Sequence, residues 1–253
     1  NPELQWQKTQ DNNIGLDLTL FDRLDLTFDY YIKNTRNLLT PVSTPPSVGF
    51  NSYTENLGKS QNKGIEVRLN YRILKNAHKD LFLSAFATGM HNKNKIKEIS
   101  DALDYINKER DDQKSESNYD HEKDKQGTTK PSVRYRVGQS MDAIWAVRSL
   151  GIDPGSGEEI LLTKDGRKTY AWNADDQVVC GDKLPKLSGT FGFNFEYRGF
   201  GVNTSFFYRL GGQMYNQTLV DKVENADIQY NVDKRIYTDR WFEAGQAAKF
   251  KRI

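Results

Sequence analysis

Six stretches of the sequence alternate apolar and polar residues over about nine to eleven positions each. The apolar positions of the five clearest stretches are Ile14, Leu16, Leu18 and Leu20; Leu24, Leu26, Phe28, Tyr30 and Ile32; Ile65, Val67, Leu69 and Tyr71; Phe191, Phe193, Phe195 and Tyr197; and Val202, Thr204, Phe206, Tyr208 and Leu210. Successive side chains of a strand point to opposite faces, so a period of two predicts strands with one apolar and one polar face. Strands of soluble proteins average about five to six residues, whereas a tilted strand needs roughly nine to eleven to cross a bilayer. The pattern therefore predicts an all-β protein with membrane-spanning antiparallel strands.

The sixth stretch, between Asp80 and Asn92, is ambiguous. Its two sets of alternating positions are Leu81, Leu83, Ala85 and Ala87, and Phe82, Ser84, Phe86 and Thr88. Both sets contain large apolar residues, so the pattern predicts a strand but leaves open which side meets the lipid.

The connections between these stretches alternate in length. The short ones are Phe21–Arg23, Leu74–Lys79 and Arg198–Gly199, and the long ones are about 34–62, 93–186 and the chain after Gly211. Outer-membrane barrels have short periplasmic turns and long extracellular loops. A soluble sandwich shares the alternation of residues but does not usually sort its loops in this way. The loop lengths therefore favour a barrel wall whose short turns face the periplasm.

The longest connection, residues 93–186, is predicted to be an extracellular loop with structure of its own. One short amphipathic helix is predicted there by apolar residues three, four and three positions apart, at Ile96, Ile99, Leu103 and Ile106. Residues 107–130 are almost all charged or small and polar, which is typical of a solvated excursion. Between Ser140 and Trp172, two turn sequences alternate with short apolar runs, which predicts a short hairpin.

Composition excludes several classes of protein. The chain is 36% hydrophobic and 28% charged with a mean hydropathy of -0.78, so little of it is available for a large soluble core, and no apolar run is long enough for a transmembrane helix. Acidic and basic residues are interspersed, which argues against a nucleic-acid partner. A single cysteine and three scattered histidines provide neither a disulfide nor a metal-ligand spacing, so no cofactor is expected.

No catalytic constellation is apparent, so the chain is not expected to be an enzyme. The carboxylate doublets Glu158-Glu159 and Asp175-Asp176 are adjacent in sequence, and neighbouring side chains of an extended strand diverge. The stretch Asp153–Glu159 has oxygen ligands for calcium, but it lacks the spaced acids of a calcium loop and a plain turn is favoured. A secreted glycoside hydrolase would need a specific carboxylate pair.

Several strings in the sequence resemble the SusC/RagA family of TonB-dependent transporters. They are NPELQWQKTQDNNIGLDLTLFDRLDLTFDYYIKNTRNLL, ENLGKSQNKGIEVRLNY, GQSMDAIWAVRSLGIDPGSGEEI and LPKLSGTFGFNFEYRGFGVNTSFFYRLGGQMYNQTL, followed by DKRIYTDRW and FKRI. The resemblance implies that residues 1–253 are the C-terminal part of a multi-pass outer-membrane barrel, without the plug and the earlier strands. It also implies import of oligosaccharides or peptides with a SusD-like surface lipoprotein, powered by the TonB complex through the N-terminal part that this chain lacks.

In this interpretation the chain supplies barrel wall, channel lining and extracellular loop. The expected channel-lining residues are Asp17, Asp25, Asp29, Glu66, Arg68, Arg72, Glu196 and Arg209. In the extracellular loop, Trp145, Arg148, Tyr170 and Trp172 are of residue types enriched at interface hot spots, so they are predicted to contact the lipoprotein or the ligand; packing within the loop itself remains the alternative. At the level of the whole chain, the alternative is a soluble all-β glycan-binding module.

Overall fold

The computed structural model describes residues 4–43, 52–56, 58–101, 103–104, 107–108, 134–224, 229 and 231–252. The chain forms two compact units, each of which is described by itself. Unit 1 consists of Asn1–Leu103, Tyr135–Asp142 and Lys183–Gln213, and unit 2 of Asp104–Arg134, Ala143–Asp182 and Met214–Ile253. Among the described residues, no helix has the length and apolar character needed to cross a membrane.

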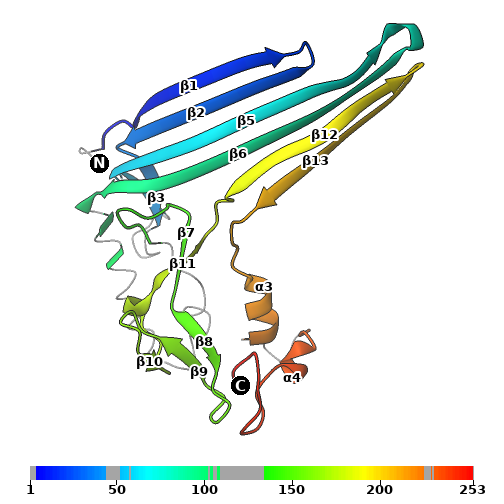
Figure 1. Ribbon diagram of the computed structural model, residues 1–253. Helices are drawn as coiled ribbons and strands as arrows, with labels where there is room; N and C mark the ends of the chain where they lie inside the picture. The colour runs from blue at the N-terminus through cyan, green and yellow to red at the C-terminus, as the bar shows by residue number, and fades with distance from the viewer. Residues whose placement is uncertain are drawn as a thin grey trace. The chain divides into compact units, whose positions relative to one another are not determined.

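Unit 1 is built on a six-stranded antiparallel sheet (Figure 1). Its strands, in spatial order, are β1 (Lys8–Leu20), β2 (Leu24–Arg36), β5 (Gly58–Asn76), β6 (Leu81–Ile99), β12 (Leu187–Tyr197) and β13 (Phe200–Leu210). Each strand has 11 to 19 residues, which exceeds the length of ordinary globular strands. The six predicted strands are thus confirmed as one continuous sheet.

The strand register separates the two faces of the sheet cleanly. One row of directly opposed residues contains Leu18, Leu26, Leu69, Ala87, Phe191 and Phe206. We call the face that carries this row the outer face, and the face that carries Asp17 the inner face. The outer face is widely exposed within the chain, with Ile14 at 72% and Phe206 at 55% exposure.

The register also settles the orientation of the ambiguous stretch in β6. Ala85 lies opposite Tyr71 and Phe193, both of which are on the outer face. The outer set is therefore Leu81, Leu83, Ala85 and Ala87. Phe86 lies on the inner face, where a Cβ on the opposing Gly192 would come within 2.8 Å of its ring. The alternation alone could not reveal this, because a large ring on the inner face is accommodated by a glycine on a strand more than one hundred residues away.

A second glycine on the inner face has the same role. Gly64 of β5 lies opposite Tyr31 of β2, and a Cβ on this glycine would collide with the tyrosine ring. The Tyr31 hydroxyl donates to Asn92 Oδ1 at 3.3 Å. The ring is therefore held against the backbone of the sheet.

The inner face carries polar groups that pair with one another. Arg72 Nη2 lies 3.1 Å from Asp25 Oδ1, and the hydroxyls of Thr88 and Thr190 are 2.9 Å apart. The register places every predicted channel-lining residue on this face: Asp17, Asp25, Asp29, Glu66, Arg68, Arg72, Glu196 and Arg209. Mixed charge suits a hydrated surface.

Three tight connections join neighbouring strands at one end of the sheet. Phe21 and Asp22 between β1 and β2 have φ of 55° and 52°, and Arg198 and Gly199 between β12 and β13 have 48° and 84°. Two successive positive φ values give the turn twist that matches antiparallel strands. The third connection contains the 3-10 helix η2 (Ala77–Lys79), so β5 runs further than the predicted link at Leu74–Lys79 allowed.

Two predictions for the long connections need correction. β6 continues to Ile99, so the long loop begins at residue 100 rather than 93, and Ile96 and Ile99 belong to a strand. The predicted helix is confined to later residues: 101, 103–104 and 107–108 are helical, while Ile106 lies outside the described residues, as does most of the charged tract. The helical spacing of Ile96, Ile99, Leu103 and Ile106 was misleading because pairing of β6 with β5 extends the strand through the first two of these residues.

The loop after β2 contains a hairpin that was not predicted, β3 (Leu39–Ser43) with β4 (Ser52–Asn56).

Unit 2 contains short strands and short helices. β7 (Ala143–Ala146) pairs with β11 (Val178–Asp182), and β8 (Arg148–Ile152), β9 (Glu159–Leu162) and β10 (Lys168–Thr169) form a three-stranded sheet. The latter confirms and extends the predicted hairpin. The helical elements are the 3-10 helix η3 (Ala174–Asp176), α3 (Gln217–Leu219), the π-helical turn η4 (Val220–Glu224) and α4 (Arg235–Thr238).

Arginine substitutions on the two faces of the sheet should have different costs. We expect Arg at Leu18, Leu69 or Phe193 to destabilise the folded barrel by roughly 2–4 kcal/mol, because the charge would enter lipid. Arg at the neighbouring inner positions Asp17, Asn70 or Asn194 should cost less, because water reaches that face. Urea titration of the full-length protein in lipid vesicles measures both sets, and equal costs on the two faces would contradict a lipid-facing outer surface.

Candidate functional site

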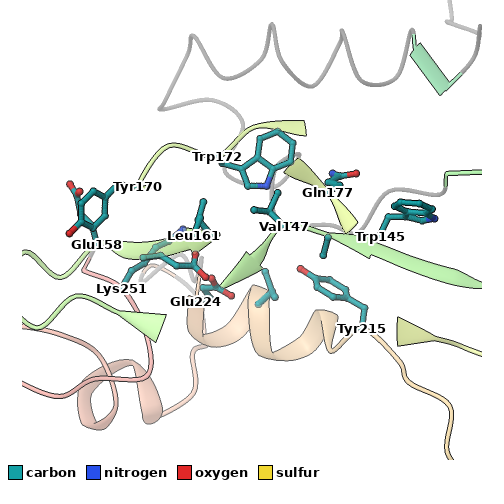
Figure 2. Close-up of a pocket in the computed structure, with 13 residues that line it drawn as sticks. Trp145, Val147, Glu158, Leu161, Tyr170, Trp172, Gln177, Tyr215, Glu224 and Lys251 are labelled. Atoms are coloured by element: carbon teal, nitrogen blue, oxygen red, sulfur yellow. The ribbon is translucent and has the colours of Figure 1, made fainter. Parts of the chain in front are cut away.

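Unit 2 contains a partly open cavity of about 440 Å³ that is lined by residues of its strands and its C-terminal segment (Figure 2). Trp172 enters from the loop before η3, and Tyr215 enters from the opposite side, where the chain approaches α3. The lining also includes Trp145, Ala146, Val147, Glu158, Glu159, Leu161, Tyr170, Gln177, Val220, Glu224 and Lys251. Eight of these thirteen residues are aromatic or aliphatic, and five are charged or carry an amide.

The strands β7 and β11 form one wall of the cavity. Ala143 and Trp145 alternate with partly exposed neighbours on β7 and are buried, Trp145 to 4% exposure. Gln177, which immediately precedes β11, is also buried, at 3%. Trp145 and Gln177 thus line the cavity as largely buried side chains.

Asp153 anchors the turn between β8 and β9. Its carboxylate accepts hydrogen bonds from the Gly155 amide at 2.9 Å, the Ser156 hydroxyl at 3.1 Å and the Tyr170 hydroxyl at 2.7 Å. The bond from Tyr170 and then that from Gly155 lower the pKa of Asp153, while the bond to Asp153 raises the pKa of Tyr170. The carboxylate is therefore used to hold the turn, as the preference for a plain turn over a calcium loop predicted.

The C-terminal segment packs against this same turn. The indole of Trp241 lies where a Cβ on Gly157 would be, and its Nε1 donates to the Pro154 carbonyl at 2.9 Å. Arg252 adds a backbone bond to the Gly157 carbonyl at 2.9 Å and an ion pair with Glu158 at 2.8 Å. These contacts hold Glu158, which lines the cavity, against the segment of the chain that contains Trp241 and Arg252.

Arg240 positions two of the charged residues that line the cavity. It is only 2% exposed, and its guanidinium donates to the carbonyls of Lys251 at 2.7 Å and Glu224 at 2.9 Å, and to that of Val223. One planar fork thus ties the end of η4 to the final residues of the chain. Since Glu224 and Lys251 both line the cavity, Arg240 is a positioning residue for them.

The cavity has an excess of negative charge. Glu158, Glu159 and Glu224 line it together with the single cation Lys251. Burial raises the pKa of Glu224, and the neighbouring Glu159 raises it further, whereas Lys251 and Arg240 act in the opposite direction. Carboxylates, an amide and two aromatic rings can bind polar ligands by hydrogen bonds and stacking.

The structure brings three of the four predicted site residues to one place. Trp145, Tyr170 and Trp172 all line the cavity, whereas Arg148 is exposed on β8 and is not part of the lining. The residues that sequence reasoning missed come from the end of the chain: Tyr215, Glu224, Lys251 and the supporting Arg240. The strings DKRIYTDRW and FKRI contain Arg240 and Lys251, but neither has a pattern that indicates the burial of Arg240. Among the described residues, no group of three or more His, Cys, Asp or Glu is arranged to hold a metal ion.

Comparison with known proteins agrees with this architecture. The family described as TonB dependent receptor-like, beta-barrel, matches residues 1–241. TonB-dependent receptors P3 and P26 of Formosa agariphila are 28% and 30% identical to the chain over 237 and 234 residues, which cover 87% and 85% of it. The chain spans only 22% and 21% of the length of these relatives.

The fold also has solved counterparts. A structure of the RagAB peptide transporter matches the whole chain with a TM-score of 0.75 at 22% identity, and the match covers 26% of that protein. The RagAB peptide importer in its 'closed-closed' state matches with a TM-score of 0.71 at 23% identity, covering 99% of this chain and 27% of the other. At this level of identity the likeness concerns the fold.

Replacing Arg240 should loosen the end of the chain around the cavity. We expect Arg240→Met to destabilise unit 2 by about 3 kcal/mol, because three buried carbonyl groups lose their donor. The measurement is the urea midpoint for proteolytic cleavage within residues 214–253 of the full-length protein. Arg235→Met is a suitable control, since Arg235 is exposed and pairs with Asp233 on the surface. Similar midpoints for the two variants would show that Arg240 does not hold the segment.

The stability of the same segment should depend on Glu224 and on pH. The folded-state pKa of Glu224 is raised, so ionising it costs more in the folded than in the unfolded chain. This penalty is absent below the unfolded pKa of about 4.3, grows as pH rises above that value and is complete above the folded pKa. We therefore expect Glu224→Gln to raise the urea midpoint at pH 7 and to have no effect at pH 3.5. An equal effect at both pH values would contradict the assignment.

Proposed function

The chain belongs to the TonB-dependent receptor-like β-barrel family, and from this premise we propose that it forms part of the wall and the extracellular surface of an outer-membrane transporter. The transporter is of the SusC/RagA type and imports oligosaccharides or peptides together with a SusD-like surface lipoprotein. Residues 1–253 belong to the C-terminal part of its barrel, and the loop between β6 and β12 is extracellular. The relatives are TonB-dependent receptors rather than enzymes, and coupling to TonB involves parts of the full-length protein outside this chain.

The continuous apolar outer face is the observation that carries the proposal. On β12 the outer row runs from Leu187 to Tyr197, about 34 Å at ~3.4 Å per residue, which corresponds to about 26 Å of membrane at a tilt of ~40°. This height agrees with the roughly 25 Å apolar band of outer-membrane barrels. The alternative, a soluble glycan-binding module, would leave an exposed apolar surface across all six strands, and a soluble protein rarely exposes one so large.

The cavity of unit 2 is proposed to contact the imported ligand. Trp172 and Tyr215 offer two ring faces on which a sugar or an aromatic peptide side chain can stack. Gln177 and Glu159 offer the hydrogen-bonding groups that either class of ligand needs. The RagAB proteins are described as a peptide transporter, and the carboxylates of the cavity suit the amino groups of a peptide as well as the hydroxyls of a glycan.

Arg148 is proposed to contact the lipoprotein instead. It is exposed on β8 and is not among the residues that line the cavity. Arginine is enriched at the hot spots of protein interfaces, where its planar guanidinium group can donate two parallel hydrogen bonds to one carboxylate. The four predicted residues thus divide into a ligand group and a partner group.

This division is tested by two variants of the full-length transporter expressed with its lipoprotein. We expect Trp172→Ala to slow uptake of the natural oligosaccharide or peptide severalfold with normal co-purification of the lipoprotein, because a stacking surface is lost. Arg148→Ala should weaken co-purification, whereas Arg167→Ala should not, since Arg167 is exposed and pairs only with the nearby Asp165. Normal uptake in the first variant and normal co-purification in the second would assign both residues to local packing.

A further inference from the structure

The outer face changes character abruptly at the end of the sheet where the long connections leave. In the first four strands the last apolar row contains Ile14, Tyr30, Ile65 and His91. The next row towards the long connections contains Asn12, Ile32, Lys63 and Lys93. Lys63 lies two residues from Ile65 along β5, about 7 Å. The apolar band therefore ends within one row of residues.

Cations dominate the outer face beyond this boundary. Lys63 and Lys93 are directly opposed and exposed, and Lys95 follows on β6. Further out, one row of opposed residues begins with Lys8, Arg36 and Lys59. We call these six residues, Lys8, Arg36, Lys59, Lys63, Lys93 and Lys95, the basic belt. Like charges placed directly opposite one another on a sheet destabilise it, so the arrangement requires compensation.

The compensation does not come from the sheet itself. Among the described residues of the six strands, the outer face has one carboxylate, Glu98, which is 2.5 Å from Lys59. The other carboxylates of these strands are on the inner face, at Asp11, Asp17, Asp25, Asp29, Glu66 and Glu196. At the same level of the sheet the inner cation Lys33 is paired with Asp11 at 3.3 Å. The excess of positive charge is therefore specific to the outer face.

We propose that the basic belt binds the phosphate groups of glycolipid headgroups in the outer leaflet of the membrane. This inference rests on the proposed function, since that function places the apolar rows in the lipid. Lys63, Lys93 and Lys95 are within two rows of the apolar edge and then lie at the level of the headgroups, with Lys8, Arg36 and Lys59 one row further out. Clusters of four to eight lysines and arginines beside an apolar membrane segment attract anionic lipid headgroups, at about 1 kcal/mol each. An array spread over four strands can hold more than one phosphate.

The first measurement uses the unaltered full-length transporter in detergent. Fluorescent diphosphorylated lipid A and its dephosphorylated form serve as probes, and we expect the phosphorylated form to bind at least tenfold more tightly, with a preference that declines as salt rises. Inorganic phosphate at millimolar concentration should compete weakly. Equal binding of the two lipids would overturn the proposal, and so would complete displacement by inorganic phosphate, which would indicate a site for the free anion.

The second measurement locates the site. Replacing Lys63, Lys93 and Lys95 together with Gln should weaken binding of the phosphorylated lipid by about 100-fold. The matched control removes three inner-face cations, Lys33, Lys75 and Arg209, and should leave lipid binding within about twofold. Equal losses in the two variants, or no loss in the first, would overturn the belt as the site.

The proposed function can be judged separately from the belt. Heat-modifiable gel mobility shows whether the barrel is folded in both variants. If the Gln substitutions impair folding, replacement of the same three lysines with Arg keeps the positive charge and should bind the phosphorylated lipid normally. If the full-length protein needs detergent and takes up its substrate normally but binds the two lipids equally, the lipid-binding role of the basic belt is wrong and the proposed transport function stands. If the full-length protein is stable without detergent, the proposed function itself is wrong.

Discussion

Backbone hydrogen bonding in lipid is the constraint on which this structure depends. A polar backbone group that enters hydrocarbon without a partner costs several kcal/mol, so a chain that crosses with strands must pair them continuously. In the sheet of unit 1 the four inner strands are paired on both sides, and β1 and β13 form its edges. Register matters as much as pairing, because a slip by one residue would exchange the lipid-facing and water-facing sets. Even so, bulges occur at only two places between β5 and β6, near Ser60 and Leu74.

The same constraint separates the roles of the two units. Within the sheet, side chains can vary as long as each row keeps its polarity, which leaves little room for a specialised binding geometry. Unit 2 is not subject to it and uses short strands, a π-helical turn and a buried arginine to form a partly open cavity. The ligand recognition that we propose therefore lies in unit 2, and the barrier that we propose lies in the sheet.

Most of the sheet could be predicted from the sequence, because alternation is a local property of each strand. Leu18 and Asp17 identify their faces without reference to any other strand, and so do Leu69 and Asn70. β6 could not be assigned in this way, since both of its faces carry large apolar residues and the inner position of Phe86 follows from pairing with β5 and β12. The supposed helical spacing of Ile96 and Ile99 failed for a related reason, because their environment is set by pairing with β5.

The cavity was only half predictable. Trp145, Tyr170 and Trp172 were identified by residue type, but types enriched at interfaces do not separate a buried wall from an exposed contact. The other half comes from residues 214–252, which return to the cavity from far along the chain. That return depends on Arg240 reaching carbonyl groups at Val223, Glu224 and Lys251, and such long-range backbone contacts leave no local signature.

The glycines beneath Tyr31 and Phe86 have a consequence for the width of the channel in the transporter that we propose. An aromatic ring that stands upright on a barrel wall projects roughly 6–7 Å into the bore, and rings on several strands would together narrow it severely. Gly64 and Gly192 instead let each ring recline on the wall, so that aromatic surface is gained at almost no loss of free cross-section. A side chain at position 64 would displace the Tyr31 ring, whereas one at position 192 would meet the Thr204 carbonyl oxygen as well as the Phe86 ring. In the transporter that we propose, the width open to a solute thus depends partly on two positions that have no side chain.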